Sequence, residues 1–447
     1  MELLRHLTDA LWCPWLLGLF LLTGLVYSLG SGFFQLFGLG RWWRATAGSL
    51  LRRGQGRRGE GLSSLQALAT ALASTMGTGS IAGVAAALVL GGPGAVFWMW
   101  VSAFLGMMTG CGEKILSVKY QRPAPGGGLQ GGPMFYLRDG LGCPLLAGWF
   151  ALACLPATLA GGSLVQSSSI AASLEAAFGA GRGWVGLCTA LLAGAIMAGG
   201  LGRIARVSSA LVPMMALLYL GSGGAVLLLQ AHRLPGALAL IFSSALSPAA
   251  ALGGGAGWTV ASAMRYGVAR GVFTNEAGLG TSAMAHGAAR ADCPARQGMW
   301  GIFEVFLSTL LVCTVTALVI LVSGLWPPQG APTLSGAPLT AAAFSDALGP
   351  AGSWVVALSL LLFAFSSILG WSYYGQQCLR FLTGSDRLLL PYRALFLLCV
   401  LAGAVWEPEA AWLLVDLCNA LMALPNLTAL LFLAPRALAE LRKATPP

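Results

Sequence analysis

Two apolar stretches, one in each half of the chain, are interrupted at mid-length by small and polar residues. The interruptions are residues 74–80, which read STMGTGS, and residues 273–280, which read FTNEAGLG. In a bilayer core each unpaired peptide group costs several kcal/mol, so a helix can break there only where its bare N–H and C=O groups line a buried cavity. Paired breaks therefore indicate a ligand site near the middle of the membrane, a layout found in many secondary transporters.

The composition indicates whether the protein is surrounded by water or by lipid. Hydrophobic residues make up 57% of the chain, charged residues 9%, and the mean hydropathy is +0.78, against about 25% charged residues in soluble domains. The apolar runs are continuous over about 20 residues, whereas a closed barrel shows segments of about 10 residues with alternating polarity. We therefore expect an all-α membrane protein embedded in a lipid bilayer.

Charge and cysteine placement exclude several partners. The net charge is +10, but the basic residues are divided among short loops, which argues against nucleic acid as a partner. The ten cysteines are scattered, without a CxxC pair or a histidine at metal-binding spacing, and we interpret them as small core residues.

Apolar runs of sufficient length predict about eleven transmembrane helices, two of them discontinuous. Without the first helix, ten remain, and the broken helices then begin two groups of five. Because five is odd, the groups cross the bilayer in opposite senses, which is an inverted repeat. The spans are expected near residues 11–37, 62–90, 94–118, 144–178, 184–200, 207–229, 257–289, 298–325, 351–378, 388–404 and 410–433.

This layout predicts three regions: an N-terminal extra helix with a basic loop at 1–60, a first five-helix repeat at 61–230, and a second at 231–447. We interpret the loops at 121–133 and 326–338, which are rich in Pro or Gly, as turns within one unit. The N-terminus carries Arg5 and then apolar residues without a small-residue cleavage motif, so a retained first helix is expected instead of a removed signal peptide.

Lysine and arginine gather in alternate loops, which the positive-inside rule assigns to the cytoplasm. The N-terminus is then outside and the C-terminus inside. The opposite loops carry Asp346, Glu407 and Glu409 against Arg182 and Arg233. The proposed cytoplasmic residues are Arg41, Arg44, Arg52, Arg53, Arg57, Arg58, Lys119, Arg122, Arg138, Arg203, Arg206, Arg290, Arg296, Arg380, Arg387, Arg436, Arg442 and Lys443.

Residues 91–106, GGPGAVFWMWVSAFLG, resemble the signature of the alanine/glycine:cation symporters, also called sodium:alanine symporters. Five further segments are similar to that family in order: GTGSIAGVA from Gly77, GGPMFYL from Gly131, GVARGVFTNEAGLGTSAMAHGAA from Gly267, FAFSSILGWSYYG from Phe363, and VDLCNALMALPNL from Val415. The resemblance covers nearly the whole chain.

The resemblance implies a leucine-transporter-like core of ten helices with one extra N-terminal helix. It also implies sodium- or proton-coupled uptake of small amino acids such as alanine and glycine at the inner (plasma) membrane of a bacterium, with no enzymatic activity and no cofactor besides the coupling ion.

A zwitterionic amino acid needs donors for its carboxylate and acceptors for its ammonium group. Glycines let the first break turn freely, and its N–H groups, near the start of a half-helix, can hold an anion. Carbonyl groups and polar side chains at the second break can accept from the ammonium group, and two aromatic residues can cap a small cavity. The expected substrate-binding residues are Gly77, Thr78, Gly79, Ser80, Gln166, Phe273, Thr274, Asn275 and Trp371.

Sodium prefers oxygen ligands, and neutral carbonyl and hydroxyl groups suffice for it. Similarity to the leucine-transporter fold implies a site between the carbonyl groups of Ala73 and Met76 and the hydroxyl groups of Ser366 and Ser367. Because none of these residues titrates in the useful range, we favour sodium over a proton as the coupling ion. A proton-coupled carrier remains the alternative.

Three positions depart from the family pattern. Ser80 replaces the usual Asn, and Ser168 replaces Asn in a Gln-Ser-Asn-Ser run that here begins at Gln166. A hydroxyl reaches less far than an amide, which leaves substrate choice or a second sodium site open. Gln376 stands where the family often has Glu.

Several charged residues in apolar runs have two readings. Arg270 and Glu276 lie near mid-span, where charges are usually paired, and can form a gate together or hold the broken helix in shape. Asp416 can join an outer gate or pack against Asn419.

We interpret His286 as a structural residue in preference to a member of a proton relay. We interpret Glu113 and Lys114 as a solvated ion pair at a helix end. The serines at 366 and 367 can also simply bond their own preceding turn.

The rival classes are a channel and a membrane-embedded enzyme. A channel needs a continuous polar pore, often with rings of charge, whereas the polar residues here converge on two breaks. An enzyme needs a nucleophile with its base, or His and acidic residues at metal-binding spacing, and the three histidines, at 6, 232 and 286, are unrelated in sequence.

Overall fold

The computed structural model describes residues 2–50, 62–124, 127–246, 260–291, 293–326, 334–406 and 409–444. Some predictions fall outside these ranges. They are the basic residues Arg52, Arg53, Arg57 and Arg58, the acidic Glu407, the first residues of the span expected at 257–289, and most of the loop at 326–338.

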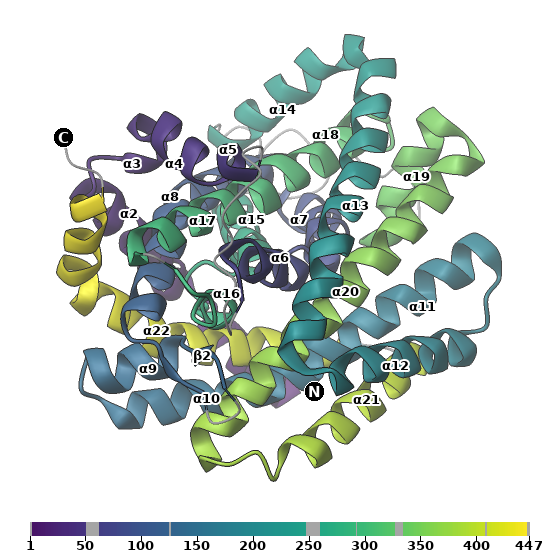
Figure 1. The fold of residues 1–447 in the computed structure, drawn as a ribbon. Helices are drawn as coiled ribbons and strands as arrows, with labels where there is room; N and C mark the ends of the chain where they lie inside the picture. Colours follow the sequence, from purple (N-terminus) through teal and green to yellow (C-terminus); the bar gives the residue numbers. More distant parts are fainter. Residues whose placement is uncertain are drawn as a thin grey trace.

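The described chain is almost entirely helical (Figure 1). In the first half the elements are α1 Glu2–Leu11, α2 Pro14–Gly30, α3 Phe34–Phe37, α4 Leu39–Ala45, α5 Ala47–Leu50, α6 Ser64–Thr75, η1 Thr78–Ser80, α7 Ala82–Gly91, α8 Gly94–Lys119, β1 Arg122–Pro123, β2 Leu129–Gln130, α9 Pro133–Phe135, η2 Tyr136–Gly140, α10 Pro144–Leu159, η3 Ala160–Leu164, α11 Val165–Phe178, α12 Arg182–Ala198 and α13 Gly200–Leu229.

The second half continues with η4 Ala231–Arg233, α14 Leu234–Leu246, α15 Val260–Asn275, α16 Thr281–His286, α17 Pro294–Val305, η6 Phe306–Cys313, α18 Thr314–Val322, α19 Ala337–Leu348, α20 Pro350–Thr383, α21 Leu389–Val405 and α22 Glu409–Ala444. Of these, η2, η3 and η6 are π-helical turns, and η3 and η6 each lie inside a longer helix.

Within the described residues, six helices are long and apolar enough to cross a membrane. They coincide with six predicted spans: Gly94–Lys119, Pro144–Phe178, Gly200–Leu229, Pro294–Val322, Pro350–Thr383 and Ala410–Ala444. Three shorter apolar helices, α2, α12 and α21, coincide with three more. The two remaining predicted spans contain the breaks. The chain is thus a multi-pass helical membrane protein, while the total of eleven spans and the inverted repeat stay predictions.

Three helices of ten or more residues were not expected. α1 precedes the first predicted span, α14 follows α13, and α19 starts where we placed a turn. They have 10, 13 and 12 residues, which is too short for a rule that seeks about 20 apolar residues. The loop at 121–133 also holds a small antiparallel pair, β1 with β2, so it is more than a simple turn.

Both predicted breaks are present. The first runs from α6 through Met76 and Gly77 into the short η1, and then into α7; the second separates α15 from α16 by residues 276–280. The two broken helices lie side by side near the centre of the molecule, where α6 packs on α16 and α7 packs on α15 (Figure 1). They therefore run antiparallel, and their breaks meet at one level. Leu62 pairs with Ala289, which ties the start of α6 to the residues after α16.

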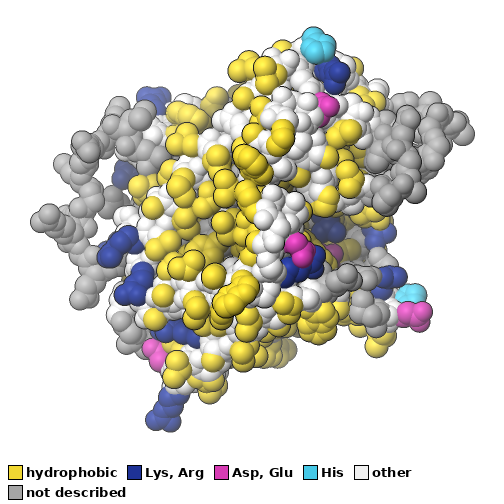
Figure 2. Space-filling model, turned by 90° about the vertical axis from the view of Figure 1, so that its right-hand side faces the viewer, with side chains coloured by type: hydrophobic (Ala, Val, Ile, Leu, Met, Phe, Trp, Pro, Cys, Tyr) yellow, Lys and Arg dark blue, Asp and Glu magenta, His cyan; other side chains and the backbone are white. Residues whose placement is uncertain are grey.

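The outer surface is apolar. Figure 2 shows one face covered by hydrophobic side chains, with most Lys and Arg residues near its margins. Exposed residues on several helices include Leu217 at 76%, Leu228 at 80% and Leu191 at 65% exposure. An apolar area this extensive is unusual on a soluble monomer and fits contact with lipid.

The expectation that Glu113 and Lys114 form a solvated pair is wrong. Both side chains are completely buried, because α8 continues to Lys119 and turns this part of the helix toward α16 and α17. The Lys114 Nζ atom lies 3.4 Å from Glu113 Oε2 and 3.4 Å from Glu304 Oε2. One lysine therefore neutralises carboxylates from two helices.

The same buried cluster holds α16 in place. Lys114 Nζ donates to the Ser282 hydroxyl at 2.7 Å. His286, at the end of α16, lies with its Nε2 atom 3.2 Å from Glu304 Oε2 and its Nδ1 atom 2.6 Å from the Gln297 amide. The broken half-helix is thus fastened to α8 and α17 by charged and polar contacts, which supports the structural interpretation of His286.

Replacing Lys114 by Met should be strongly destabilising, because it leaves two buried carboxylates without their cation, at a cost of about 3–5 kcal/mol. The measurement is thermal unfolding of the purified chain in detergent. Arg380→Met is the matched control: Arg380 pairs with the half-exposed Asp386 at 2.7 Å, and such a surface pair contributes about 0–1 kcal/mol. Equal, small losses in both variants would contradict this role for Lys114.

Candidate functional site

The first break begins where α6 stops. Ser63 caps the other end of this helix, with a Ser63–Gln66 capping box, and the helical bonds end when Met76 N–H donates to Leu72 at 2.9 Å. Gly77 then adopts an extended conformation, with φ −101° and ψ −154°. A Cβ atom on Gly77 would lie 2.6 Å from Ser367 Oγ and 3.3 Å from Gln166 Oε1. Glycine is therefore required here for close approach to two neighbouring helices.

Hydroxyl groups of distant helices satisfy the carbonyl groups around this break. Ser366 and Ser367 of α20 each donate to the Ala73 carbonyl at 3.0 Å, and Ser367 also lies 3.1 Å from the Ser74 carbonyl. On the other side, Thr316 of α18 donates to the Ser80 carbonyl at 2.8 Å. In a low-dielectric interior these bonds replace water that the break cannot reach.

The second break has a tighter backbone. Among its five residues, Glu276, Gly278 and Gly280 have positive φ values of 55°, 94° and 80°. The Gly278 N–H group donates to Glu113 Oε1 at 2.9 Å, and the Asn426 amide donates to the Gly278 carbonyl at 2.9 Å. Both peptide groups of this glycine are thus paired with side chains of α8 and α22.

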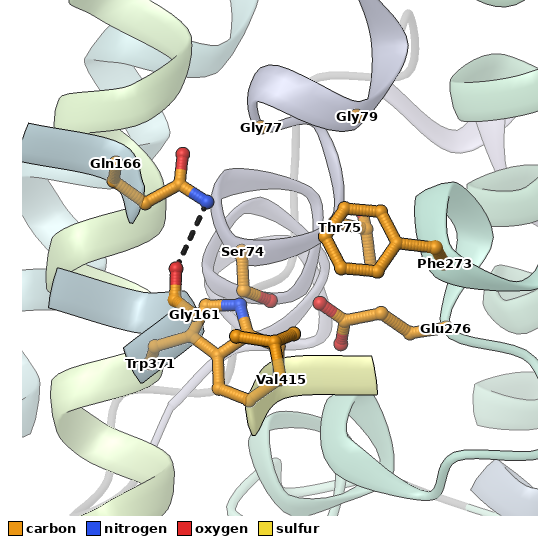
Figure 3. Close-up of a pocket in the computed structure, with 10 residues that line it drawn as sticks. All are labelled: Ser74, Thr75, Gly77, Gly79, Gly161, Gln166, Phe273, Glu276, Trp371 and Val415. Carbon is orange, nitrogen blue, oxygen red and sulfur yellow. Dashed lines mark hydrogen bonds between the residues drawn. The ribbon is translucent and has the colours of Figure 1, made fainter. Parts of the chain in front are cut away.

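A small pocket lies between the two breaks (Figure 3). Figure 3 shows the Glu276 carboxylate and the Ser74 hydroxyl pointing into the pocket, with Phe273 and Trp371 on opposite sides and Gly77 and Gly79 beyond them. The lining residues are Ser74, Thr75, Gly77, Gly79, Gly161, Gln166, Phe273, Glu276, Trp371 and Val415.

Five of the residues predicted to bind substrate line this pocket: Gly77, Gly79, Gln166, Phe273 and Trp371. The Gln166 side chain bridges α11 and the first break, because its Oε1 accepts from Thr78 N–H at a long 3.4 Å and its Nε2 donates to the Gly161 carbonyl at 3.1 Å. The contact to Thr78 N–H is long and therefore weak.

The other four predicted residues, Thr78, Ser80, Thr274 and Asn275, are buried beside the pocket but do not line it. Thr274 donates to the Arg270 carbonyl one turn earlier at 2.8 Å, and the Asn275 Oδ1 accepts from Ala277 N–H at 3.0 Å. The hydroxyls of Thr78 and Ser80 and the Asn275 Nδ2 make no hydrogen bond within the described residues, so unused polar groups surround the breaks.

Three of the four residues predicted to bind sodium come together. The Ala73 carbonyl oxygen and the hydroxyl groups of Ser366 and Ser367 form a group of buried oxygens behind the pocket. Ser366 also donates to the Phe363 carbonyl in its own preceding turn. Its hydroxyl group therefore makes both the contact expected of a cation site and the contact expected of a structural serine. Met76 is fully buried at the end of α6.

Sequence reasoning did not assign Ser74, Thr75, Gly161, Glu276 and Val415 to the pocket. Two signals were available: a charged residue inside an apolar break, at 276, and a glycine pair in the middle of an apolar span, at 161–162. That pair falls in the π-helical turn η3, where a Cβ atom at residue 161 would meet Val415 at 3.0 Å. Ser74 and Thr75 lie within the predicted first break, whereas Val415 carries no such signal.

Arg270 and Glu276 do not pair with each other in the described structure. Arg270 Nη2 lies 3.9 Å from Asp416 Oδ2, and its guanidinium also lies over the rings of Phe273 and Trp412. Glu276 Oε2 instead accepts from the Thr281 hydroxyl at 2.5 Å. Arg270 and Asp416 are only partly exposed and form a layer over the Phe273 side of the pocket.

All three departures are buried. Ser80 lies in the first break and Ser168 lies on α11, two residues after Gln166. Gln376 lies further along α20, where its Oε1 accepts two hydrogen bonds from the Arg393 guanidinium, at 2.9 and 2.7 Å. The neutral amide thus has an arginine partner.

Residues 1–445 match the model of a family described as the sodium:alanine symporter family. The sodium/alanine symporter AgcS of Methanococcus maripaludis is 40% identical over 438 residues, which is 97% of this chain and 94% of that protein. The probable sodium/glutamine symporter GlnT of Bacillus subtilis is 35% identical over 441 residues, 97% of this chain and 89% of that protein.

A crystal structure of a manganese transporter from Eremococcus coleocola is similar in fold, with a TM-score of 0.54 and 16% identity, over 86% of this chain and 79% of that one. The likeness extends over most of both chains and shows that the two proteins share an overall fold.

Gly77→Ala should destabilise the chain, because the new methyl group would overlap Ser367 Oγ; overpacking of this kind costs about 1–3 kcal/mol. Gly83→Ala is the control. Nothing lies within 4 Å of a Cβ at Gly83, which is inside α7, and Ala there should be neutral or stabilising by up to about 1 kcal/mol. The measurement is thermal unfolding in detergent, and matching shifts for both variants would contradict the close approach at Gly77.

Proposed function

Because the chain belongs to the sodium:alanine symporter family, and is a transporter and not an enzyme, we propose that it couples inward sodium movement to uptake of a small neutral amino acid. The proposed substrates are alanine and glycine, carried by alternating exposure of one central site. A proton-coupled amino-acid carrier is the alternative.

The observation that carries this proposal is the contact between α6 and α20. The hydroxyl groups of Ser366 and Ser367 lie 3.0 Å from the Ala73 carbonyl, three residues before Met76, and Gly77 lines the pocket. A cation held by these oxygens and an amino acid in the pocket would therefore order the same segment, residues 73–80. Each would then favour binding of the other, and this coupling is reciprocal.

The pocket supports a small substrate. Its walls include Phe273 and Trp371, and glycines 77, 79 and 161 bring the backbone close to the ligand. A Cβ at Gly79 would lie 3.0 Å from the Phe273 ring, which leaves little room for a long side chain. One relative is named as a probable sodium/glutamine symporter, and a panel of amino acids will define the substrate size that this chain accepts.

The remaining parts of the proposal follow from the sequence. Residues 61–230 and 231–447 would form two inverted repeats after an extra N-terminal helix, and the antiparallel broken helices support that layout. The loops rich in lysine and arginine would lie in the cytoplasm, with the N-terminus outside the inner membrane.

In proteoliposomes, an inward sodium gradient should drive uptake of labelled alanine, whereas potassium or proton gradients of equal size should not. The double variant Ser366→Ala, Ser367→Ala should raise the sodium concentration for half-maximal uptake by roughly tenfold or more, equivalent to at least about 1.4 kcal/mol, because two oxygens of the cation site are lost.

Ser359→Ala is the matched control, since Ser359 is a buried serine two turns earlier on α20. Its sodium dependence should equal that of the unchanged chain. Alanine uptake that ignores sodium, or that follows a proton gradient instead, would contradict sodium coupling.

A further inference from the structure

Glu276 is the one acidic side chain among the described residues that line the pocket, and no lysine, arginine or histidine lines it. The residue is 1% exposed. A carboxylate at such a depth is costly unless a positive charge accompanies it. The pocket therefore has one negatively charged end, and the positive charge that accompanies it has to be identified.

The nearby basic side chains are already paired with other acidic side chains. Lys114 lies between Glu113 and Glu304, and Arg270 faces Asp416. Within the part of the chain that the structure describes, Glu276 makes no ion pair and accepts its hydrogen bond from a neutral hydroxyl, that of Thr281. That bond involves Oε2, and it orients the carboxylate while Oε1 receives no hydrogen bond from the described residues.

The backbone conformation at this position is also unfavourable for a residue other than glycine. Glu276 has a φ of 55°, in the left-handed region that non-glycine residues seldom occupy and where strain amounts to about 1–3 kcal/mol. The next two left-handed positions in the same break are glycines, at 278 and 280. A glutamate at a position where glycine is favoured points to a use for its side chain.

Figure 3 places that side chain in the pocket: the carboxylate points toward Ser74 from the second break, while Gly77, Gly79 and Gln166 lie on the far side. A ligand between them would meet an acidic group at one end and amide donors at the other. This polarity matches a zwitterion, whose ammonium group would face Glu276.

We infer that the Glu276 carboxylate binds the α-ammonium group of the transported amino acid and, oriented by Thr281, selects amino acids over hydroxy acids. This rests on the proposed function and replaces carbonyl groups near Phe273 and Thr274 as the principal partner of the ammonium group.

The test compares L-alanine with L-lactate, which keeps the carboxylate and methyl group but has a hydroxyl in place of the ammonium group. Dissociation constants for both are measured by calorimetry on the purified full chain in sodium, for the unchanged protein and for Glu276→Gln. Glu276→Gln should raise the alanine constant by roughly 30-fold or more, the size expected when one partner of a buried charge pair is removed. The lactate constant should change by less than about threefold, because no charge pair is lost.

Glu304→Gln is the matched control. It removes a fully buried carboxylate that contacts Lys114 and His286 but does not line the pocket, so the ratio of the two constants should stay that of the unchanged protein. If Glu276→Gln does not fold, Glu276→Asp withdraws the carboxylate by one methylene, and should weaken alanine more than lactate.

Equal changes for alanine and lactate in the Glu276 variant, or no change in either, would overturn the inference and assign the carboxylate to the fold or to the coupling cation. These outcomes leave the proposed function intact when the unchanged chain still binds alanine in sodium. An unchanged chain that binds no alanine would refute the proposed substrate, and this inference with it.

Discussion

Every peptide group that a helix break exposes inside this membrane protein must find a partner within the protein, and the arrangement around the two breaks follows from that requirement. Hydroxyls of Thr316, Ser366 and Ser367 reach the carbonyls on either side of the first break. Glu113 and Asn426 bond both peptide groups of Gly278 in the second. The helices that supply these groups are thereby tied to the centre of the molecule.

This requirement links structural support to transport. The oxygens that satisfy the end of α6 are also the oxygens proposed to bind the cation, since neutral carbonyl and hydroxyl groups are suitable sodium ligands. A cation arriving beside Ala73 would change the bonding of the same segment that lines the pocket. The buried cluster of Lys114, Glu113 and Glu304 keeps the second break fixed, so the adaptable part of the site is the first.

The main helices and both breaks were predictable, because hydrophobic length and interruption are local properties of the sequence. The glycines at 77 and 79 and the aromatic residues at 273 and 371, which the sequence predicts to bind substrate, line one pocket, and their binding role stays a prediction. The pairing of Arg270 with Asp416, and the burial of Glu113 with Lys114, were not predictable from the chain alone, since both depend on which face of each helix meets its neighbours. Thr78 and Asn275 are beside the pocket for the same reason: a side chain's direction at a break depends on dihedral angles that the sequence does not reveal.

The central claim is that ligand and cation order one segment, residues 73–80. Calorimetric titration of the purified chain with alanine, first in sodium and then in potassium at the same ionic strength, tests it most directly. The account predicts that alanine binds in sodium and that its affinity is lower in potassium by roughly tenfold or more. This difference corresponds to a coupling free energy of at least about 1.4 kcal/mol. Equal affinities in the two salts would show that the cation and the amino acid do not share this segment.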